Sequence, residues 1–508
     1  MKKGKNLKKL LAATFVFFTL SAIIAVPGLS ADPVVKVTLL HINDVYEMDP
    51  VSGGTQGGLA RVATLKKELL KKNPNTYTIM AGDLFSPSAL GTAPYKGGRL
   101  DGRQMVATMN KLGLDYITFG NHEFDLNKES FYARLGESRS NWVSSNVFDE
   151  KGGHFPGVSE SEIITVTADL DNKVRIGLFG VTLASNKKPY VTYKDPLKTA
   201  REMVKKLRSK VDILIAVTHL AIEQDMQIAK ELPDVDLILG GHEHENIQVW
   251  RGLDFTPVFK ADANARTVYV HELIYNTEKK DLQIVSQLRF ITGEIPDDPE
   301  TAKVIKKWRE AGYKGFKRSG FDPENVIAKT TESLDGLESS VRNTSTRLTE
   351  LIGEGMLDVS PGAELAIFNG GSVRIDDVIL PGKITEYDVI RIMPFGGNVM
   401  SVKMKGRLLK QVLDQGRKNR DTGGYLQTEN VSLSKDGSKW LINGKKLKSG
   451  KKYSVAINDF LLMGKESGLD YLTEDNKNIT NVRKHGDIRK ALIYQLQKAY
   501  GDKNMDVK

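Results

Sequence analysis

Between residues 35 and about 290, short apolar runs alternate with stretches whose apolar side chains recur at helical spacing. One such stretch places Leu59, Val62, Leu65 and Leu69 on a single helical face between two apolar runs. This alternation is typical of β-strands connected by helices, and it predicts an α/β domain built on a sheet. The apolar runs that we interpret as buried strands are residues 35–40, 76–80, 116–119, 213–217 and 235–239.

The pattern changes after residue 296. Residues 297–316 are rich in charge and keep a few apolar members at helical spacing, and a helix-breaking run around Gly320 follows. We therefore expect a linker helix within residues 297–320 and a second domain over residues 321–508, which is long enough to hold its own core. Its candidate helices are 341–354 and 407–415, and its candidate strands are 363–368, 398–404 and 453–457.

The first residues have the layout of a secretory signal peptide. Basic residues come first, an apolar run spans 10–26, and small residues follow up to Ala31. We predict a signal peptide over residues 1–31 and a secreted or cell-envelope location, in the periplasm or outside the cell. Because the apolar run is long for a cleaved signal, an uncleaved membrane anchor is the alternative. No later segment is apolar for long enough to span a bilayer.

The charge and the cysteine content narrow the choice of partners. The formal net charge of +10 would fall to +5 on cleavage, because the signal segment carries five lysines and no acidic residue. A net positive charge this small does not favour nucleic acid as a partner. The chain has no cysteine, so it forms no disulfide, and any metal site must use nitrogen and oxygen ligands.

Polar clusters follow all five predicted strands. They are residues 41–46 (HINDVY), 82–83 (GD), 120–125 (GNHEFD), 218–219 (TH) and 241–244 (GHEH). The carboxyl ends of strands in an open α/β sheet meet at one edge, where ligands bind. Carboxylates and an amide suit hard ions, whereas imidazoles favour Zn, Mn, Co or Fe over Mg or Ca. The pattern therefore predicts a site for two neighbouring metal ions.

Three runs give the chain a resemblance to the 5'-nucleotidase family: residues 120–125, residues 240–244 (GGHEH) and residues 369–374 (NGGSVR). The resemblance covers nearly all of the chain that would remain after signal cleavage. It implies a four-layer α/β/β/α dinuclear metallophosphoesterase domain over residues 35–296. It also implies a linker helix over 297–320 and an α+β substrate-binding domain over 321–508.

The same resemblance implies the ligands of two divalent ions, whose identity among Mn, Zn, Co and Mg stays open. Asp44 and His244 would bind the first ion, and Asp83 would bridge both. The ligands of the second ion would be Asn121, His219 and His242.

His122 resembles the family's catalytic histidine, and Asp125 its orienting carboxylate. The implied reaction is hydrolysis of a phosphomonoester by a metal-bound hydroxide, with both ions neutralising charge on the phosphoryl oxygens. A histidine cation held by a carboxylate would stabilise the same charge.

The first motif departs from the family, which usually has Asp-x-His where this chain has Asp44-Val45-Tyr46. A phenol with an ordinary pKa near 10 is a weak ligand unless it is deprotonated. Three interpretations stay open. Tyr46 coordinates the first ion, it stands outside a weaker first site, or that site is empty and the protein only binds nucleotides. Alternatively, its ring simply packs at the sheet edge.

The resemblance also implies contacts to the substrate from the second domain. Glu338 stands where some family members carry an arginine, which argues against a highly anionic substrate tail. Phe395 and Tyr471 would sandwich a nucleobase by stacking, although the segment around Tyr471 has lost the family's glycine pattern. The complete set of implied substrate contacts is Arg342, Asn369, Gly371, Arg374, Phe395, Asn398, Tyr471 and Asp475.

We therefore expect a phosphomonoesterase for nucleoside 5'-monophosphates, acting on a small phosphorylated molecule as a monomer or dimer. One alternative is a phosphatase for a sugar phosphate such as mannosylglucosyl-3-phosphoglycerate. Others are a UDP-sugar or cyclic-nucleotide hydrolase and a nucleotide-binding protein without activity. Family members rotate their two domains about the linker, so the second domain's contacts are expected far from the metals in a structure without substrate.

Overall fold

The computed structural model describes residues 34–167 and 173–501. The predicted signal peptide lies outside these residues. Within the described ranges, no helix is both long and apolar enough to cross a membrane.

Two sheets form the centre of the N-terminal domain. Neighbouring strands β1, β2, β5 and β6 are parallel, as are β10, β12, β13 and β15. The seven-stranded sheet has the order β17 (Asp281–Phe290), β16 (Thr267–Asn276), β1 (Val34–Ile42), β2 (Thr76–Met80), β5 (Tyr116–Ile117), β6 (Asn141–Val143), β8 (Val158–Ser159). The six-stranded sheet has the order β14 (Ile247–Arg251), β15 (Thr256–Lys260), β13 (Leu237–Gly241), β12 (Ile213–His219), β10 (Lys173–Thr182), β9 (Ser161–Thr167).

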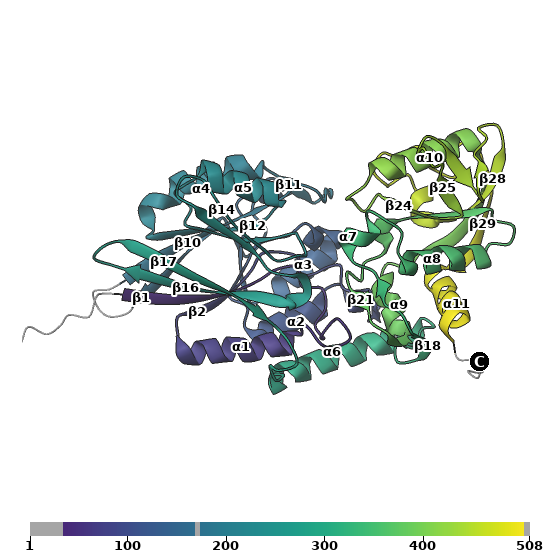
Figure 1. Cartoon of the computed structure of the whole chain (residues 1–508). Coiled ribbons are helices and arrows are strands. Elements are labelled where there is room, and N and C mark those ends of the chain that lie inside the picture. Colours follow the sequence, from purple (N-terminus) through teal and green to yellow (C-terminus); the bar gives the residue numbers. More distant parts are fainter. Residues whose placement is uncertain (1–33, 168–172, 502–508) are drawn as a thin grey trace, which may run out of the picture.

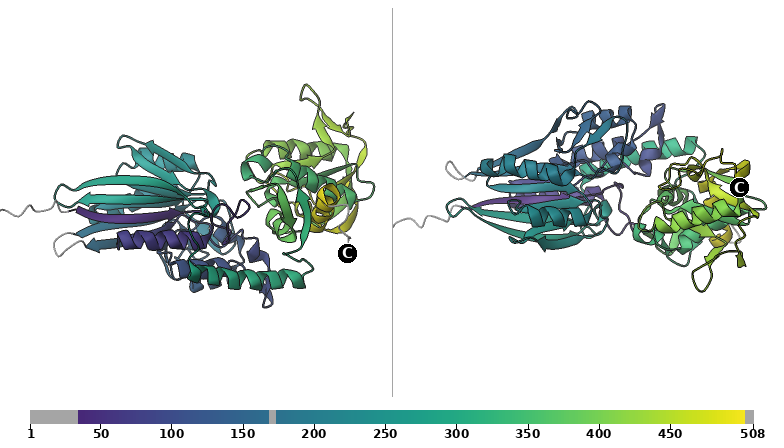
Figure 2. Two further views of the ribbon diagram at one scale, coloured as in Figure 1. Left: turned by 60° about the horizontal axis from the view of Figure 1, so that its bottom comes forward. Right: turned by 90° about the horizontal axis from the view of Figure 1, so that it is seen from above.

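The alternation of side chains along β1 explains how the sheets stack. Val35, Val37 and Leu39 belong to the apolar core between the two sheets. Leu40 and Ile42 point to the opposite face, because successive side chains of a strand alternate between faces. Helices cover both outer faces, which gives the expected four layers (Figures 1 and 2). The covering helices are α1 (Leu59–Lys72), α2 (Arg103–Leu112) and α3 (Lys128–Glu137) on one side, and α4 (Pro196–Leu207) and α5 (Ile222–Glu231) on the other.

Helix α6 (Pro299–Arg318) leads along the edge of the first domain to the second (Figure 1). Its start follows from the sequence, because the side chain of Asp298 accepts a hydrogen bond from Thr301 N–H and Pro299 occupies the first turn. Gly320, which has a positive φ of 85°, lies just after its end.

The C-terminal domain is a five-stranded sheet flanked by helices. Its strands have the order β24 (Leu426–Glu429), β20 (Leu365–Asn369), β28 (Lys452–Asn458), β23 (Asn398–Lys405), β29 (Ile479–Asp487). The helices named below are α7 (Glu338–Val341), α8 (Arg347–Asp358), α9 (Glu386–Ile392), α10 (Gly406–Lys418) and α11 (Ile488–Tyr500).

The predicted helix over 341–354 is wrong in its boundaries. The chain instead forms α7 and α8 with a turn between them. Thr346 interrupts the helix because its hydroxyl accepts a hydrogen bond from Thr349 N–H and caps α8. Arg342 therefore lies in the turn and not within a helix.

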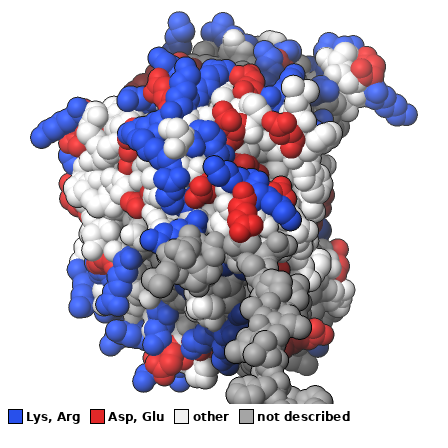
Figure 3. Space-filling view, turned by 90° about the vertical axis from the view of Figure 1, so that its left-hand side faces the viewer, with Lys and Arg blue, Asp and Glu red and all other residues white. Residues whose placement is uncertain are grey.

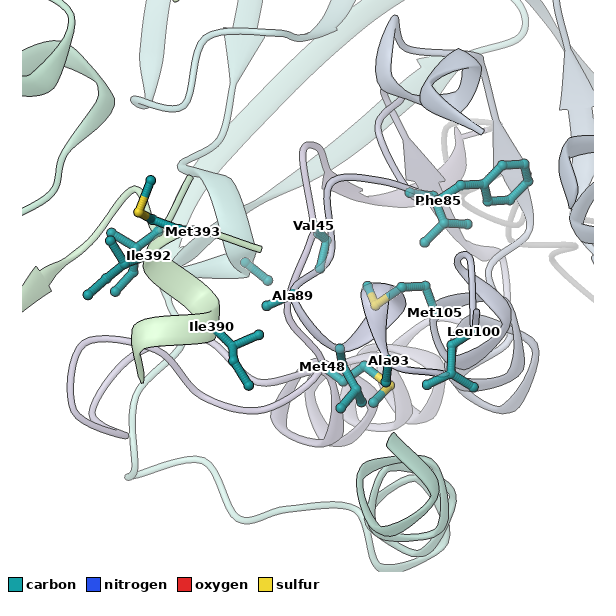
Figure 4. Packing of buried hydrophobic residues seen from close by; sticks show 14 of the residues in the cluster. Val45, Met48, Phe85, Ala89, Ala93, Leu100, Met105, Ile390, Ile392 and Met393 are labelled. Atoms are coloured by element: carbon teal, nitrogen blue, oxygen red, sulfur yellow. The ribbon is translucent and has the colours of Figure 1, made fainter. Parts of the chain in front are cut away.

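The two domains share one apolar cluster. Val45 and Met48, from the loop after β1, belong to the same cluster as Ile390 and Met393 at α9 (Figure 4). Polar contacts also cross this boundary between the two domains, which we call the seam. Among them, the Ser52 backbone N–H donates a hydrogen bond to Asp377 at 2.8 Å. The domains are docked against each other in this structure.

Positive charge gathers at the amino ends of the strands, on the face shown in Figure 3. Lys71 and Lys72 end α1 there, and Lys205 and Lys206 end α4. Cations at the last turn of a helix are favoured by the helix dipole. This basic face is at the opposite edge of the sheets from the polar clusters described next.

Candidate metal centre

The predicted ligands meet where the parallel strands of both sheets end. Asp44 follows β1, Asp83 follows β2, and His219 is the last residue of β12. One ligand atom from each lies within 4.8 Å of the others, and the three side chains are 0–1% exposed. Asn121 joins them, because its Oδ1 lies 3.1 Å from His219 Nε2. The structure therefore brings carboxylate, amide and imidazole ligands from four strand ends into one cluster.

The backbone around the cluster is unusual. Asp44, Asp83 and His242 have φ values of 51°, 61° and 86°. Residues other than glycine rarely adopt this left-handed backbone region. Such conformations persist where surrounding contacts hold them. Here the His242 backbone N–H donates to Asp44 Oδ2 at 2.9 Å. Gly82 is required beside them, because a Cβ there would lie 2.5 Å from His219 Nδ1.

The orientation of His219 leaves one ring nitrogen facing the cluster. Its Nδ1 is 2.8 Å from the Ala81 carbonyl oxygen, which accepts a hydrogen bond from Nδ1–H. Its Nε2 then faces Asp83 Oδ2 at 3.3 Å. Metal-binding histidines are typically fixed in this way.

The charges of the cluster compensate one another. Burial acts to lower the pKa of His219, but Asp83 and Asp44 raise it to about 10. Burial acts to raise the pKa of Asp83, but His219 and His122 hold it well below its usual range. A buried cation is thus strongly stabilised at this point, and the donor set of oxygens and imidazoles fits divalent metal ions.

Tyr46 points into the cluster and is 5% exposed. Its Oη lies 3.1 Å from Asp44 Oδ1, 3.0 Å from Asp83 Oδ2 and 3.1 Å from His244 Nε2. Burial, followed by Asp83 and Asp44, raises the pKa of this phenol well above its ordinary value. The phenol oxygen therefore lies among the predicted ligands of the first site.

His122 lies beside the cluster and is held from three directions. Its Nδ1 is 2.8 Å from Asp125 Oδ2, and its backbone N–H donates to Asp83 Oδ1 at 2.8 Å. Its Nε2 is 3.2 Å from a guanidinium nitrogen of Arg374, in the C-terminal domain. For Arg374, the expected separation of the second domain's contacts from the metal site is therefore not seen.

Sequence reasoning missed residues that support this arrangement. Asn186 donates to Asp125 at 2.7 Å, and it follows β10, a sixth strand end that the apolar pattern of residues 174–181 signals. Lys260 is fully buried and donates to the carbonyl oxygens of Leu220 and Gly241 at 2.6 and 2.8 Å, which ties together the segments after β12 and β13. A lysine within a strand carries no comparable signal.

Glu123, inside the motif but not singled out, organises the loops. Its carboxylate accepts hydrogen bonds from the backbone N–H groups of Asp83, Leu84, Phe85 and Gly120. Burial is the main cause that raises its pKa to about 7.

The predicted substrate contacts are less concentrated. Asn369 and Gly371 are at the carboxyl end of β20, where Asn369 Oδ1 accepts from Ser372 Oγ at 2.6 Å. Arg342 and Arg374 both pair with Glu338, the latter at 3.6 Å. Asn398 donates to Asp459 at 2.7 Å.

The two predicted aromatic walls lie in different surroundings. Phe395 is 51% exposed and lines a pocket of about 370 Å³ together with Ser86 and Asp125. Tyr471 packs against the separate apolar core that includes α10, and Asp475 is exposed in a turn. The structure therefore does not bring Tyr471 and Asp475 to the pocket of Phe395, and their role stays a prediction.

A larger pocket of about 770 Å³ lies between the metal cluster and the C-terminal domain. Among the described residues that line it, carboxylates outnumber arginines and no Phe, Tyr or Trp occurs. The charged side chains of its lining are Asp83, Glu243, Glu245, Asp262, Glu338, Asp376, Asp377, Asp421, Arg266 and Arg342.

Comparisons with known proteins agree with this architecture. A model of the calcineurin-like phosphoesterase family matches residues 37–246, and one of the 5'-nucleotidase C-terminal domain matches residues 326–474. The chain is 26% identical over 447 residues to the trifunctional nucleotide phosphoesterase protein YfkN of Bacillus subtilis, covering 78% of this chain but 29% of that protein. It is 24% identical over 529 residues to a 5'-nucleotidase of Vibrio cholerae, covering 91% of each.

Among solved structures, a 5'-nucleotidase precursor from Thermus thermophilus has a TM-score of 0.75 at 23% identity. The match covers 92% of this chain and 97% of that chain, and it shows that the two share a fold.

Proposed function

The chain belongs to the 5'-nucleotidase family of phosphoric monoester hydrolases, and on this premise we propose that it hydrolyses nucleoside 5'-monophosphates with two bound divalent ions. The observation that carries the proposal is the buried cluster of Asp44, Asp83 and His219, with His122 and Arg374 facing each other beside it.

We assign the predicted ligands to two ions. Asp44 and His244, with the Tyr46 oxygen within reach, would hold the first, and Asp83 would bridge both. The ligands of the second would be Asn121, His219 and His242. When bound, such ions acidify water and neutralise charge on a phosphoryl group.

The side chains beside the ions would handle the phosphate. A guanidinium nitrogen of Arg374 lies 3.2 Å from His122 Nε2, so a phosphoryl oxygen that displaces this contact would meet both groups. Asp125 fixes the orientation of the His122 ring through its contact with Nδ1.

A second candidate substrate is a sugar phosphate. It is favoured by the large pocket beside the predicted metal ligands, whose described lining offers carboxylates and no Phe, Tyr or Trp ring for stacking. Carboxylates accept hydrogen bonds from sugar hydroxyls, whereas a nucleobase gains most from a flat apolar partner. We further propose that the chain is exported, on the basis of residues 1–31.

The test is phosphate release by metal-stripped protein to which Mn, Mg, Co or Zn is added back, with AMP and a glycosyl 3-phosphoglycerate as substrates. Metal-dependent hydrolysis of AMP that His122→Ala removes is the expected result. Hydrolysis of the glycoside alone would replace the nucleotide by a sugar phosphate. Binding of AMP without turnover with any of these metals would contradict a hydrolase and leave a nucleotide-binding protein.

A further inference from the structure

An aspartate of the C-terminal domain reaches a predicted metal ligand of the N-terminal domain. Asp376 lies two residues after Arg374, and its Oδ2 is 2.7 Å from His244 Nδ1. The opposite nitrogen of that ring, Nε2, faces the cluster, at 3.1 Å from Tyr46 Oη and 3.7 Å from Asp44 Oδ1. Asp376 thus touches His244 on the side turned away from the first metal site.

The position of Asp376 is fixed independently of this contact. Its φ of 41° is in the left-handed region, as at Asp44, Asp83 and His242. Its Oδ1 accepts a hydrogen bond from the Glu338 backbone N–H at 2.9 Å, and its carbonyl oxygen accepts one from Arg266. An unfavourable backbone conformation that several contacts maintain is often found where a side chain has to be aimed.

We propose that Asp376 is a positioning residue for His244 and that the C-terminal domain thereby completes the first metal site. The carboxylate accepts a hydrogen bond from His244 Nδ1–H, which would leave the Nε2 lone pair free to hold the first ion. Glu338 Oε2 is also near Nδ1, at 3.1 Å, but that carboxylate pairs with Arg342 and Arg374. The inference rests on the proposed function, because it takes His244 to be a metal ligand.

A single substitution separates the hydrogen bond from the backbone conformation. Asn tolerates the left-handed region well, so Asp376→Asn keeps the backbone. Its amide has one acceptor oxygen where the carboxylate has two, so it cannot accept from both Glu338 N–H and His244 Nδ1–H. With its NH₂ group toward His244, it would favour the tautomer that carries hydrogen on Nε2, which cannot bind a metal.

The adjacent Asp377 provides the matched control. It is 4% exposed and crosses the same seam, where it accepts from the backbone N–H and the hydroxyl of Ser52 and lies 3.3 Å from Arg391. Asp377→Asn therefore changes a neighbouring carboxylate between the same two domains and leaves the Asp376 carboxylate on His244 in place. Glu338→Gln tests whether the other carboxylate near Nδ1 has the role instead.

The measurement is titration of the metal-stripped full-length chain with Mn²⁺ by calorimetry, without substrate. Circular dichroism and thermal unfolding check that each variant is folded. We expect two sites in the native chain, with one of them about 10- to 100-fold weaker in Asp376→Asn, as is usual when the partner of a metal-binding histidine is lost. Both sites should be unchanged in Asp377→Asn and Glu338→Gln.

Native affinity in Asp376→Asn would overturn the inference, and so would an equal loss in either control variant. If the native chain itself bound no Mn²⁺ or other divalent ion, the proposed function would fail first, and the inference with it. A native chain with two sites and an unaffected Asp376→Asn would overturn the inference alone.

Discussion

The metal-binding edge of the N-terminal domain and the substrate-binding face of the C-terminal domain differ in how firmly their predicted residues are placed. Asp83 and His219 are buried, are hydrogen-bonded from several directions and lie at the ends of parallel strands. Phe395 is half exposed, and Tyr471 packs against another core. The first set forms one cluster, whereas the second is dispersed over a whole domain.

The difference has a topological cause. Parallel strands that pair in register end at a common edge, so a residue just after each strand has little freedom of position. The C-terminal sheet is mostly antiparallel, and Phe395 and Tyr471 lie in loops and turns outside its strands. Loops change in length and path far more easily than strand ends do.

The largest effect is expected at the residue that belongs to both predicted metal sites. Asp83→Asn removes one of the two ligand oxygens and the negative charge, so we expect loss of both ions and a fall in kcat/KM of at least about 1000-fold. Metal content by mass spectrometry and phosphate release measure this. Asp212→Asn, which changes an aspartate at the opposite edge of the sheet beside Arg175, should leave the metal content unchanged. If the Asp83→Asn protein retained both ions, the predicted ligands of the N-terminal domain would be no better defined than the predicted substrate contacts of the C-terminal domain.

A smaller effect is expected at His122, whose backbone N–H, and not its side chain, donates to the predicted ligand Asp83. His122→Ala should lower kcat by about 100- to 1000-fold, because a positioned donor to the phosphoryl group is lost. Metal content should stay at the native level, since the side chain is not a predicted ligand. Loss of an ion from His122→Ala would instead place this residue in the metal site.

The sequence predicts the metal-binding edge of the N-terminal domain well, because the motifs that indicate it are short and local. An apolar run, a glycine and an acidic or histidine residue stand within a few positions of each other at 76–83 and 235–242. The four-layer fold and the parallel strands of the N-terminal domain are confirmed by the structure. The ligand roles themselves stay predictions, although the structure brings the side chains together.

What the sequence did not predict depends on contacts between distant segments. The contacts of Lys260 with Leu220, of Asn186 with Asp125 and of Asp376 with His244 span 40 to 132 positions, and no local sequence pattern predicts them. The break between α7 and α8 depends on one hydroxyl that caps a helix, and apolar spacing alone does not reveal it.

The seam between the two regions should respond to pH through Glu47, which is near Arg391 and Tyr387 of the C-terminal domain. Burial raises its pKa from 4.5 to about 7, with Arg391 acting in the opposite direction. The folded protein thus holds this proton more tightly than the unfolded chain. Its stabilising contribution is full below pH 4.5 and is lost as the pH rises through about 7, an effect of about 3 kcal/mol at most.

Glu47→Gln removes this dependence. Urea unfolding at pH 5 and pH 8 should therefore show the variant gaining about 2–3 kcal/mol relative to the native chain between the two values. Glu300→Gln, at an exposed position on α6, serves as the control. If the difference in unfolding free energy between the native chain and Glu47→Gln were the same at pH 5 and pH 8, Glu47 would not be a buried ionisable group at the seam.

The smallest expected effect addresses the dispersed region directly. Phe395 exposes its ring in a pocket shared with Asp125, so it can offer one face to a nucleobase near His122. Phe395→Ala should raise KM for nucleoside monophosphates about 3- to 10-fold with kcat unchanged, since one stacking contact is worth about 1 kcal/mol. Tyr471→Ala removes a ring that packs against the α10 core, so it should lower the melting temperature and leave KM within about twofold of the native value. An equal rise in KM for both variants would restore a two-walled base site and remove the difference between the two regions. No change for Phe395→Ala would instead favour the carboxylate-lined pocket and a sugar phosphate.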